Sequence, residues 1–446
     1  MIFNHAEAMR TRPALLAVTL LAATCAATGF PVRARASDFQ GATHLMPFDE
    51  DLIGYGKARE TNAITRLQQR IDDGSAQLAR DPRGSLLASI LRELSVPVSS
   101  QALVFSKTSF QRDRIGPSNP RALYFNERVY VGHVPGSAIL EFTAVDPALG
   151  AVFYTLDESP AQRPRFVRTD QCTECHASAR TMGVPGHLVR SFETDESGVV
   201  DLLTAVDPVN HRTPLADRWG GWFVTGLHGT QTHRGNLIGK ADHERQRTTP
   251  NHSGNVTNLS RWIEPSKYLA PTSDIVALMV LEHQQHGQNF ITRLGYEARL
   301  QLSAYGHVQY LRPQIDAFLR YVLFADEARL AAPIAGSPAF AQDFVEAGRR
   351  DSKGRSLREL DLRTRLFAHP CSFLLQGEAF AALPRALRQR ILERLDEALA
   401  TAQPNDASHH IPPSERAILR EILADTVPGY PQAPALPPST QGGAGR

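Results

Sequence analysis

The pentapeptide Cys172-Thr173-Glu174-Cys175-His176 constrains this chain more than any other segment of its sequence. Two thiols three residues apart lie on one side of a helical turn, and an imidazole follows directly. Each thiol can add to one vinyl group of a haem, and the histidine then lies beneath the iron as an axial ligand. The motif predicts one covalently bound haem c, attached through Cys172 and Cys175, with His176 as the proximal ligand of the iron.

The same cysteine spacing occurs in zinc sites and in thioredoxin-like redox pairs. A zinc site would need further ligands, and Cys371 is the only other cysteine beyond the N-terminal segment, so histidines would have to supply them. The flanking sequence lacks the strand and helix that accompany a thioredoxin-like pair. Haem c is therefore the leading interpretation, and Cys371, which lies among apolar residues, is predicted to be a buried core thiol.

The N-terminus has the features of an export signal, which would carry the two thiols to an oxidising compartment. Arg10 and Arg12 precede an apolar run over residues 14–23, and the small residues that follow end in Ala34-Arg35-Ala36. The run is too short to span a bilayer. We predict a signal peptide over residues 1–36, cleaved after Ala36, and a periplasmic or secreted protein.

The net charge of the chain argues against two classes of binding partner. The chain of 446 residues has a formal charge of +2, and loss of residues 1–36 removes four arginines and one glutamate, which leaves −1. Nucleic acids and anionic membranes both select a basic surface, so neither is expected as a partner. No second apolar stretch is long enough to span a membrane. The expected partner is a redox protein or a small-molecule electron donor or acceptor.

Hydrophobic periodicity places the motif in a β-rich part of the chain. Helical spacing between about residues 62 and 93 predicts an N-terminal helical segment within residues 37–100. Aromatic and β-branched runs separated by turn residues then predict an antiparallel meander, over residues 122–125, 128–131, 138–142 and 151–154. A hairpin signature over residues 187–192 and 199–203 follows the motif. Residues 101–262 are thus predicted to form a β-rich region that carries the haem.

The second half is predicted to be mostly helical over residues 263–427. Pro271-Thr272-Ser273-Asp274 has the hydroxyl and acidic side chains of a helix start, and the apolar pattern continues past His286. Further helices are expected over residues 296–324, 338–349, 357–367 and 385–400. Proline, glycine and small polar residues predict a disordered tail over residues 428–446. The predicted fold class is α+β, and it is not the simple fold of a class I cytochrome c.

The ligand opposite His176 separates an electron carrier from a haem enzyme. Met182 follows His176 by six residues, which is too short a connection to reach the other face of a porphyrin. Met279, His283, His286 and Phe290 share one face of the helix that starts near Ser273, so His283 and His286 are candidate distal ligands. The alternative is that these histidines form ordinary hydrogen bonds in a buried helix.

A second candidate segment runs from Trp219 to Asn236, where an aromatic strand leads into a glycine-rich loop. Backbone without side chains can approach a flat cofactor closely, so His228 and His233 are also candidate distal ligands. The alternative is a surface loop with solvated histidines. Guanidinium groups pair well with carboxylates, which makes three arginines candidate partners of the haem propionates: Arg168, Arg190 and Arg234.

Several segments carry a family resemblance: residues 119–126, 146–154, 183–191, 273–278 and 365–367, together with the haem motif. They resemble a group of large bacterial exported monohaem proteins that are described as cytochrome c domain-containing. The resemblance covers most of the mature chain and implies haem binding and electron transfer, without naming a substrate. Small class I cytochromes differ, since further helices and a distant methionine ligand follow their haem helix, whereas hairpin signals follow the motif here.

The leading hypothesis is electron transfer by a periplasmic protein, with His176 below the iron and a histidine above it. A haem enzyme of the peroxidase or oxygenase kind, with an open distal site and a histidine as acid or base, is the alternative. A redox or gas sensor is a weaker alternative, because the sequence contains no recognisable signalling domain.

Overall fold

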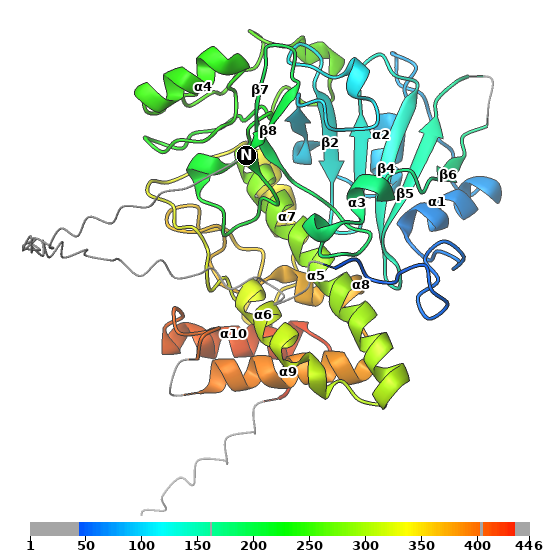
Figure 1. The fold of residues 1–446 in the computed structure, drawn as a ribbon, viewed down its shortest axis with the longest axis vertical. Coiled ribbons are helices and arrows are strands. Elements are labelled where there is room, and N and C mark those ends of the chain that lie inside the picture. Colours follow the sequence, from blue (N-terminus) through cyan, green and yellow to red (C-terminus); the bar gives the residue numbers. More distant parts are fainter. Residues whose placement is uncertain (1–43, 161–162, 402–404, 433–446) are drawn as a thin grey trace, which may run out of the picture. The chain divides into compact units, whose positions relative to one another are not determined.

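A six-stranded antiparallel sheet with its strands in sequence order forms the β-rich part of the computed structural model (Figure 1). The strands are β1 (Ala102–Val104), β2 (Arg121–Phe125), β3 (Val129–His133), β4 (Ile139–Asp146), β5 (Gly150–Asp157) and β6 (Phe166–Arg168). The structure describes residues 44–160, 163–401 and 405–432, and the predicted signal peptide lies outside them. The predicted meander corresponds to β2, β3, β4 and β5 and is confirmed.

The two faces of this sheet have different neighbours. Tyr124, Val131 and Phe142 lie on one face and belong to the same buried cluster as α1 (Ala63–Asp72) and α2 (Leu87–Glu93). The opposite face follows from the strand register and carries these residues: Arg121, Leu123, Gly132, Glu141, Thr143, Phe153, Thr155 and Val167. Several of these side chains are only partly buried. The haem motif packs on this second face, because Phe153 contacts the ring of His176.

The predicted N-terminal helix is two helices, α1 and α2, joined by turns. Asn62 caps α1 by accepting hydrogen bonds from the backbone N–H of Ile64 and Thr65. The connection contains Asp73-Gly74 and Asp81-Pro82, which favour turns over a continuous helix. The apolar residues that give this segment its helical spacing are buried on both helices, namely Leu67, Ile71, Leu87, Ile90 and Leu91, whereas Leu78 lies in the connection and is only partly buried.

The motif is followed by a hairpin, as predicted. The motif itself forms the short helix α3 (Thr173–His176), and the hairpin consists of β7 (Ser191–Thr194) and β8 (Val200–Val206). Then comes α4 (Gly239–Thr248), which the sequence analysis did not predict. Its sequence Gly-Lys-Ala-Asp-His-Glu-Arg-Gln-Arg-Thr has no apolar face, so no helical hydrophobic pattern marks it.

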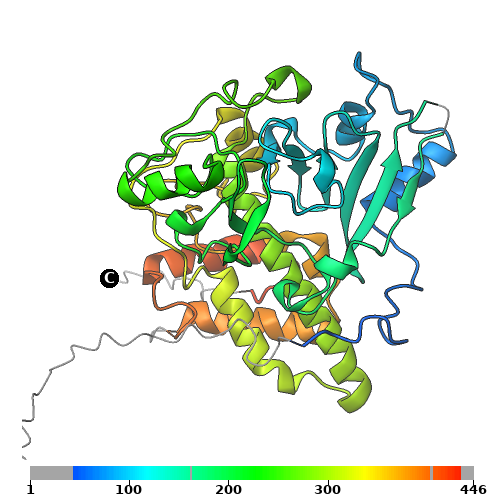
Figure 2. The ribbon, with the colours of Figure 1, turned by 45° about the horizontal axis from the view of Figure 1, so that its top comes forward.

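The C-terminal half is helical. Its longest helix is α5 (Ile275–Tyr305), and it is followed by α6 (Arg312–Val322), α7 (Pro338–Glu346), α8 (Glu378–Ala381), α9 (Arg385–Ala400) and α10 (Pro413–Thr426). Helix α5 contacts β5 as well as α6, α7 and α8, and in both ribbon views α9 and α10 lie together, apart from the six-stranded sheet (Figures 1 and 2). An α+β fold with a β-rich region before a helical half is therefore confirmed. Within the described ranges, no helix combines the length and apolarity needed to cross a membrane.

Two details of the helical half differ from the prediction. Residues 357–367 form turns rather than a helix, because Leu360 pairs with Phe367 across an antiparallel bridge and Asp361 caps the turn between them. The packed part of the chain also extends into the predicted tail. Tyr430 is buried, and its hydroxyl donates a hydrogen bond to Asp396 at 3.0 Å. Residues 433–446 of the predicted tail lie outside the described part of the chain.

Candidate haem-attachment site

The haem motif occupies a single helical turn with accessible thiols. The backbone N–H of His176 donates to the carbonyl of Cys172 at 2.9 Å, which closes the turn. Both thiols are free, and Cys172 is half-buried whereas Cys175 is exposed. A group that reacts with both cysteines can therefore approach this turn from the solvent side.

His176 is held in the tautomer that a haem ligand requires. Its Nδ1 lies 3.0 Å from the carbonyl oxygen of Gly186, and since a carbonyl can only accept, Nδ1 carries the hydrogen. The lone pair is then on Nε2, which makes no hydrogen bond within the described part of the chain. An imidazole that donates from one nitrogen and offers the other is the usual arrangement of a metal-ligating histidine.

The residues behind His176 form a segment that we call the Pro185–His187 strip. Gly186 donates its N–H to the carbonyl of His176 at 2.8 Å, and the carbonyl of Pro185 accepts from Ala151 on β5 at 3.3 Å. On its other side the strip contacts Asn289 of α5, whose amide binds both the N–H and the carbonyl of His187 at 2.7 Å each. The strip therefore joins the motif to both the sheet and α5.

His187 is a site residue that the sequence analysis did not single out. Its side chain is buried, both ring nitrogens lack a hydrogen-bond partner in the described residues, and the ring lies 4.3 Å from that of Tyr130. Burial, with a smaller contribution from His176, lowers the His187 pKa to about 3. The sequence analysis used His187 only as the start of a hairpin, although Gly186-His187 soon after the motif is a signal that could have identified it.

His187 lies on the same side of the expected iron position as His176. The Gly186 carbonyl binds Nδ1 of His176, and His187 follows Gly186 directly in the chain. A histidine side chain is too short to pass from there around the edge of a porphyrin. If His176 bound a haem iron through Nε2, His187 would therefore lie on the proximal side and could not serve as the distal ligand.

A close ion pair borders the motif on the sheet. Nη2 of Arg121 and Oε2 of Glu141 lie 2.5 Å apart. The Arg121 guanidinium lies over Gly132, and a Cβ at residue 132 would be 2.5 Å from Nη2 of Arg121. Burial raises the Cys172 pKa to about 11, and Glu141 adds to this effect. Redox-active pairs of the thioredoxin kind instead rely on a cysteine with a lowered pKa. The electrostatics of Cys172 thus give no support to a redox pair.

The zinc alternative also lacks support from the neighbouring side chains. Across residues 44–160, 163–401 and 405–432, no group of three or more histidine, cysteine, aspartate or glutamate side chains is arranged to hold a metal ion. Cys371, which could have supplied a third thiolate, is fully buried, and burial raises its pKa to about 12. Its predicted role as a core thiol agrees with this burial.

Of the three arginines predicted to bind haem propionates, the structure brings Arg190 close to His176. Burial lowers the His176 pKa, and Arg121 and then Arg190 make smaller contributions in the same direction. Nε of Arg190 lies 2.7 Å from Asp207. The same carboxylate lies 2.7 Å from Arg180, which follows the motif. Two guanidinium groups thus share one carboxylate beside the motif, and the local charge stays positive.

The other two arginines are engaged elsewhere. Arg168 pairs with Glu60 at 2.7 Å and donates to the backbone of Tyr55, and the strand register places it on the sheet face opposite Phe153 and His176. Arg234 donates to the carbonyl of Thr204 on β8 at 2.8 Å. The propionate role of these arginines stays a prediction, for which Arg190 has the most suitable position.

The predicted distal ligands on α5 belong to a separate buried cluster. His283 binds His211 through Nδ1 at 3.0 Å and Ser372 through Nε2 at 2.9 Å, so both of its ring nitrogens are engaged. His286 packs against Tyr321 at 5.0 Å. Burial lowers the pKa of each histidine, His283 and His286, to about 3. Neither residue is among the groups that contact or electrostatically influence His176.

The predicted distal ligands in the glycine-rich loop form a pair of their own. The rings of His228 and His233 lie 4.6 Å apart, and both side chains are buried. His228 contacts the carbonyls of Gln231 at 2.7 Å and Gly254 at 2.9 Å, whereas Nδ1 of His233 accepts from Gly235. The two histidines are therefore buried rather than solvated, whereas Leu227, Gly229 and Thr230 of the same loop are exposed. Neither ring contacts His176, and a distal role for either stays a prediction.

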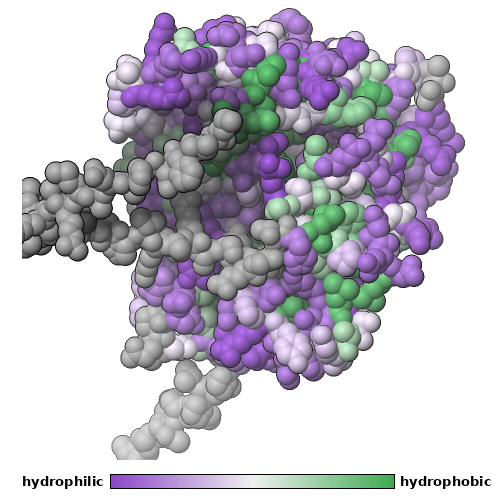
Figure 3. Space-filling model, in the orientation of Figure 1, coloured by the Kyte–Doolittle hydropathy of each residue, from purple (hydrophilic) through white to green (hydrophobic). Residues whose placement is uncertain are grey.

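Apolar side chains remain exposed on the hairpin next to the motif. Leu202 and Leu203 of β8 are 67% and 96% exposed, and Figure 3 shows hydrophobic residues gathered over this hairpin. The ion pair between Asp207, which follows β8, and Arg180 joins the hairpin to the motif. The hairpin thus leaves apolar surface uncovered, and its C-terminal end is tied to the segment that follows the motif.

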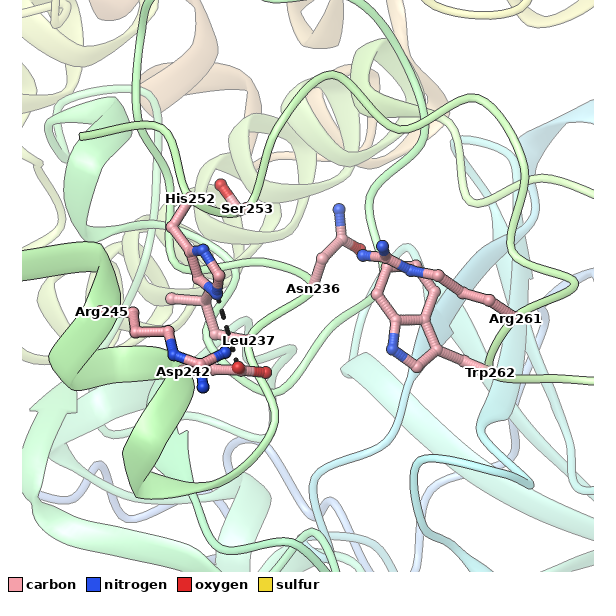
Figure 4. Close-up of a pocket in the computed structure, with 8 residues that line it drawn as sticks. All are labelled: Asn236, Leu237, Asp242, Arg245, His252, Ser253, Arg261 and Trp262. Atoms are coloured by element: carbon pink, nitrogen blue, oxygen red, sulfur yellow. Dashed lines mark hydrogen bonds and ion pairs between the residues drawn. The ribbon is translucent and has the colours of Figure 1, made fainter. Parts of the chain in front are cut away.

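A polar cavity of about 350 Å³ lies elsewhere, between α4 and the segment that contains Trp262 (Figure 4). Asp242, Arg245 and His252 lie on one side of it, and Arg261 stacks on Trp262 on the other. His252 and Asp242 are 3.4 Å apart. None of the residues that line this cavity belongs to the motif or to the predicted ligands, so it does not add to the haem site.

Comparison of the chain with protein-family models, with curated proteins and with solved structures finds no match.

Proposed function

We propose that the mature chain is an exported c-type haem protein that transfers electrons, with the haem attached through Cys172 and Cys175 and with His176 as proximal ligand. The observation that carries the proposal is the state of His176. Its Nδ1 donates to Gly186, and its Nε2 is available beside two free thiols on the same turn. Bound haem would supply an iron that gains and loses one electron reversibly.

The protein's own residues have three tasks in this proposal. The Pro185–His187 strip holds the ring of His176 in one orientation, and Phe153 packs against that ring. The exposed leucines of β8 offer apolar cover for a porphyrin. Arg190, fixed by Asp207, offers a positive charge to a propionate. Together these groups bind, orient and partly desolvate the cofactor.

The test is expression of the full chain in a bacterium that has the haem c maturation machinery. We expect a periplasmic product that starts at Ser37, has a mass increased by one haem, and gives the pyridine haemochrome spectrum of a haem with both vinyl groups saturated. A mature product without haem would refute the proposal. A cytoplasmic product with an intact N-terminus would refute its export.

Absorption spectra then distinguish a carrier from an enzyme. A six-coordinate low-spin iron that does not react with cyanide or peroxide supports electron transfer as the function. A high-spin iron that binds these ligands contradicts a simple carrier and supports the haem-enzyme alternative, since it indicates an open distal position.

A further inference from the structure

We infer that Asn289 of α5 is a positioning residue for the proximal histidine, and that it acts through the peptide group between Gly186 and His187. The inference rests on the proposed function, because it concerns the histidine that would bind the iron. It assigns a role at the haem site to a residue that lies more than a hundred positions beyond the motif in the sequence.

One peptide group connects Asn289 to His176. The carbonyl of Gly186 and the N–H of His187 belong to the same peptide. The carbonyl accepts from Nδ1 of His176 at 3.0 Å, and the N–H donates to Oδ1 of Asn289 at 2.7 Å. The three groups therefore form a continuous chain of hydrogen bonds, with Asn289 at one end and the His176 ring at the other.

Asn289 fixes the plane of this peptide as well as its polarity. Its Nδ2 also donates to the carbonyl of His187 at 2.7 Å, so the amide is bound at both ends. Asn289 is buried in the middle of α5, which limits its movement. Only glycine permits this approach at position 186, since a Cβ there would lie 2.4 Å from Oδ1 of Asn289.

The chain of hydrogen bonds determines how strongly the carbonyl accepts from His176. A peptide whose N–H is already bound is a better acceptor at its carbonyl, because successive hydrogen bonds polarise one another. A stronger acceptor at Nδ1 makes the imidazole a more basic ligand, which stabilises oxidised iron and lowers the reduction potential. Loss of the Asn289 amide should therefore raise the potential without preventing haem attachment.

The test compares three variants of the holoprotein with the wild type. Asn289→Ala removes both hydrogen bonds of the amide. Asn289→Asp keeps an acceptor for the His187 N–H but cannot donate to the His187 carbonyl. Asn236→Gly is the matched control. The side-chain amide of Asn236 binds the backbone N–H of Val224 at 2.8 Å and the backbone carbonyl of Val224 at 2.9 Å, as the amide of Asn289 binds His187. Glycine is chosen there because Asn236 has a φ of +67°.

Haem content, reduction potential and denaturant midpoint are measured for each protein. We expect Asn289→Ala to retain haem and to shift the potential to more positive values, Asn289→Asp to keep the potential at or below the wild-type value, and Asn236→Gly to lose stability with no shift. Equal shifts in Asn289→Ala and Asn236→Gly, or no shift in Asn289→Ala, would overturn the inference.

The haem content of the wild-type protein distinguishes a failure of this inference from a failure of the proposed function. A wild-type protein without haem overturns both. A wild-type protein with haem, whose potential does not respond to Asn289→Ala, overturns the inference alone. If Asn289→Ala does not fold, Asn289→Asp decides the matter, since a potential well above the wild-type value in that variant contradicts an acceptor role for residue 289.

Discussion

His176 and His283 are both confined histidines whose pKa is lowered by burial, yet they differ in the freedom of their ring nitrogens. His176 donates from Nδ1 to Gly186 and has no hydrogen bond at Nε2 among the described residues. His283 uses both nitrogens, one toward His211 and one toward Ser372. The difference between the two histidines shows that a ring nitrogen without a hydrogen bond, rather than a place on a helix face, distinguishes a candidate ligand from a structural histidine.

The surroundings of the two histidines explain this difference. His176 lies on a short surface turn over a sheet face that is only partly covered. His283 lies in the first half of α5, where side chains on every side of the helix are buried, including Glu282, Gln284 and Gln285. Burial of a polar group without a partner costs about 1–3 kcal/mol, which explains why both ring nitrogens of His283 are hydrogen-bonded.

The largest expected effect is the loss of haem attachment. Replacement of Cys172 and Cys175 together by serine should abolish the covalent haem, because serine cannot form the thioether bonds. Cys371→Ala is the control and should retain one haem, since Cys371 lies in the core. Mass spectrometry of the purified mature proteins measures both results, and a haem-bearing double variant would contradict the assignment of the motif.

The next largest effect is on the free energy of unfolding when His283 is replaced. His283→Ala should lower the free energy of unfolding by about 2–4 kcal/mol, because it removes two buried hydrogen bonds and leaves a cavity. The absorption spectrum of the holoprotein should not change. Denaturant unfolding and visible spectroscopy provide the two measurements. Loss of the low-spin spectrum in this variant would instead identify His283 as the distal ligand.

A smaller effect is the pH dependence of the stability that His283 contributes. The pKa of His283 is about 3 in the folded protein, below the ordinary value of 6.5, so its neutral ring stabilises the fold above pH 6.5. This contribution is lost as the pH falls from 6.5 toward 3. The stability difference between wild type and His283→Ala should therefore shrink between pH 6.5 and 4.5. A difference that stays constant across this range would contradict the neutral state of His283.

The smallest expected effect is a difference in reduction potential between variants of two arginines, Arg190 and Arg168. Arg190→Gln should lower the reduction potential, because it removes a positive charge near His176 that disfavours oxidised iron. Arg168→Gln should leave the potential unchanged, since Arg168 pairs with Glu60 on the opposite sheet face. Potentiometric titration measures both. Equal shifts in the two variants would mean that the sheet does not separate Arg168 from the haem.

Much of the fold was predictable because its signals are local. Alternation of apolar and polar residues marks β4, where every second residue is buried, and the turn dipeptides mark the hairpins. Helix α4 was missed because it has no apolar face. The helix predicted over residues 357–367 was wrong, because the segment turns back on itself and Leu360 pairs with Phe367 across an antiparallel bridge.

The candidate site was predictable only at the motif. Cys172, Cys175 and His176 are adjacent in the chain, so their chemistry can be recognised without a fold. The distal histidines were inferred from a helix face, which assumes that one side of α5 meets the haem, but α5 is enclosed on all sides along its first half. Asn289 carried no such signal, since its role comes from a contact with His187, which is far away in the sequence.

From the sequence came the prediction of haem attachment, the prediction of a near-neutral mature chain, and the confirmed arrangement of a β-rich region before a helical half, because each depends on residues that are neighbours in the chain. Only the tertiary structure decided which nitrogen of His176 is free, which arginine lies beside it and which histidines are already bound. Those properties depend on hydrogen bonds and burial that arise when β5, the Pro185–His187 strip and α5 pack together, and long-range packing of this kind has no periodicity that a sequence can reveal.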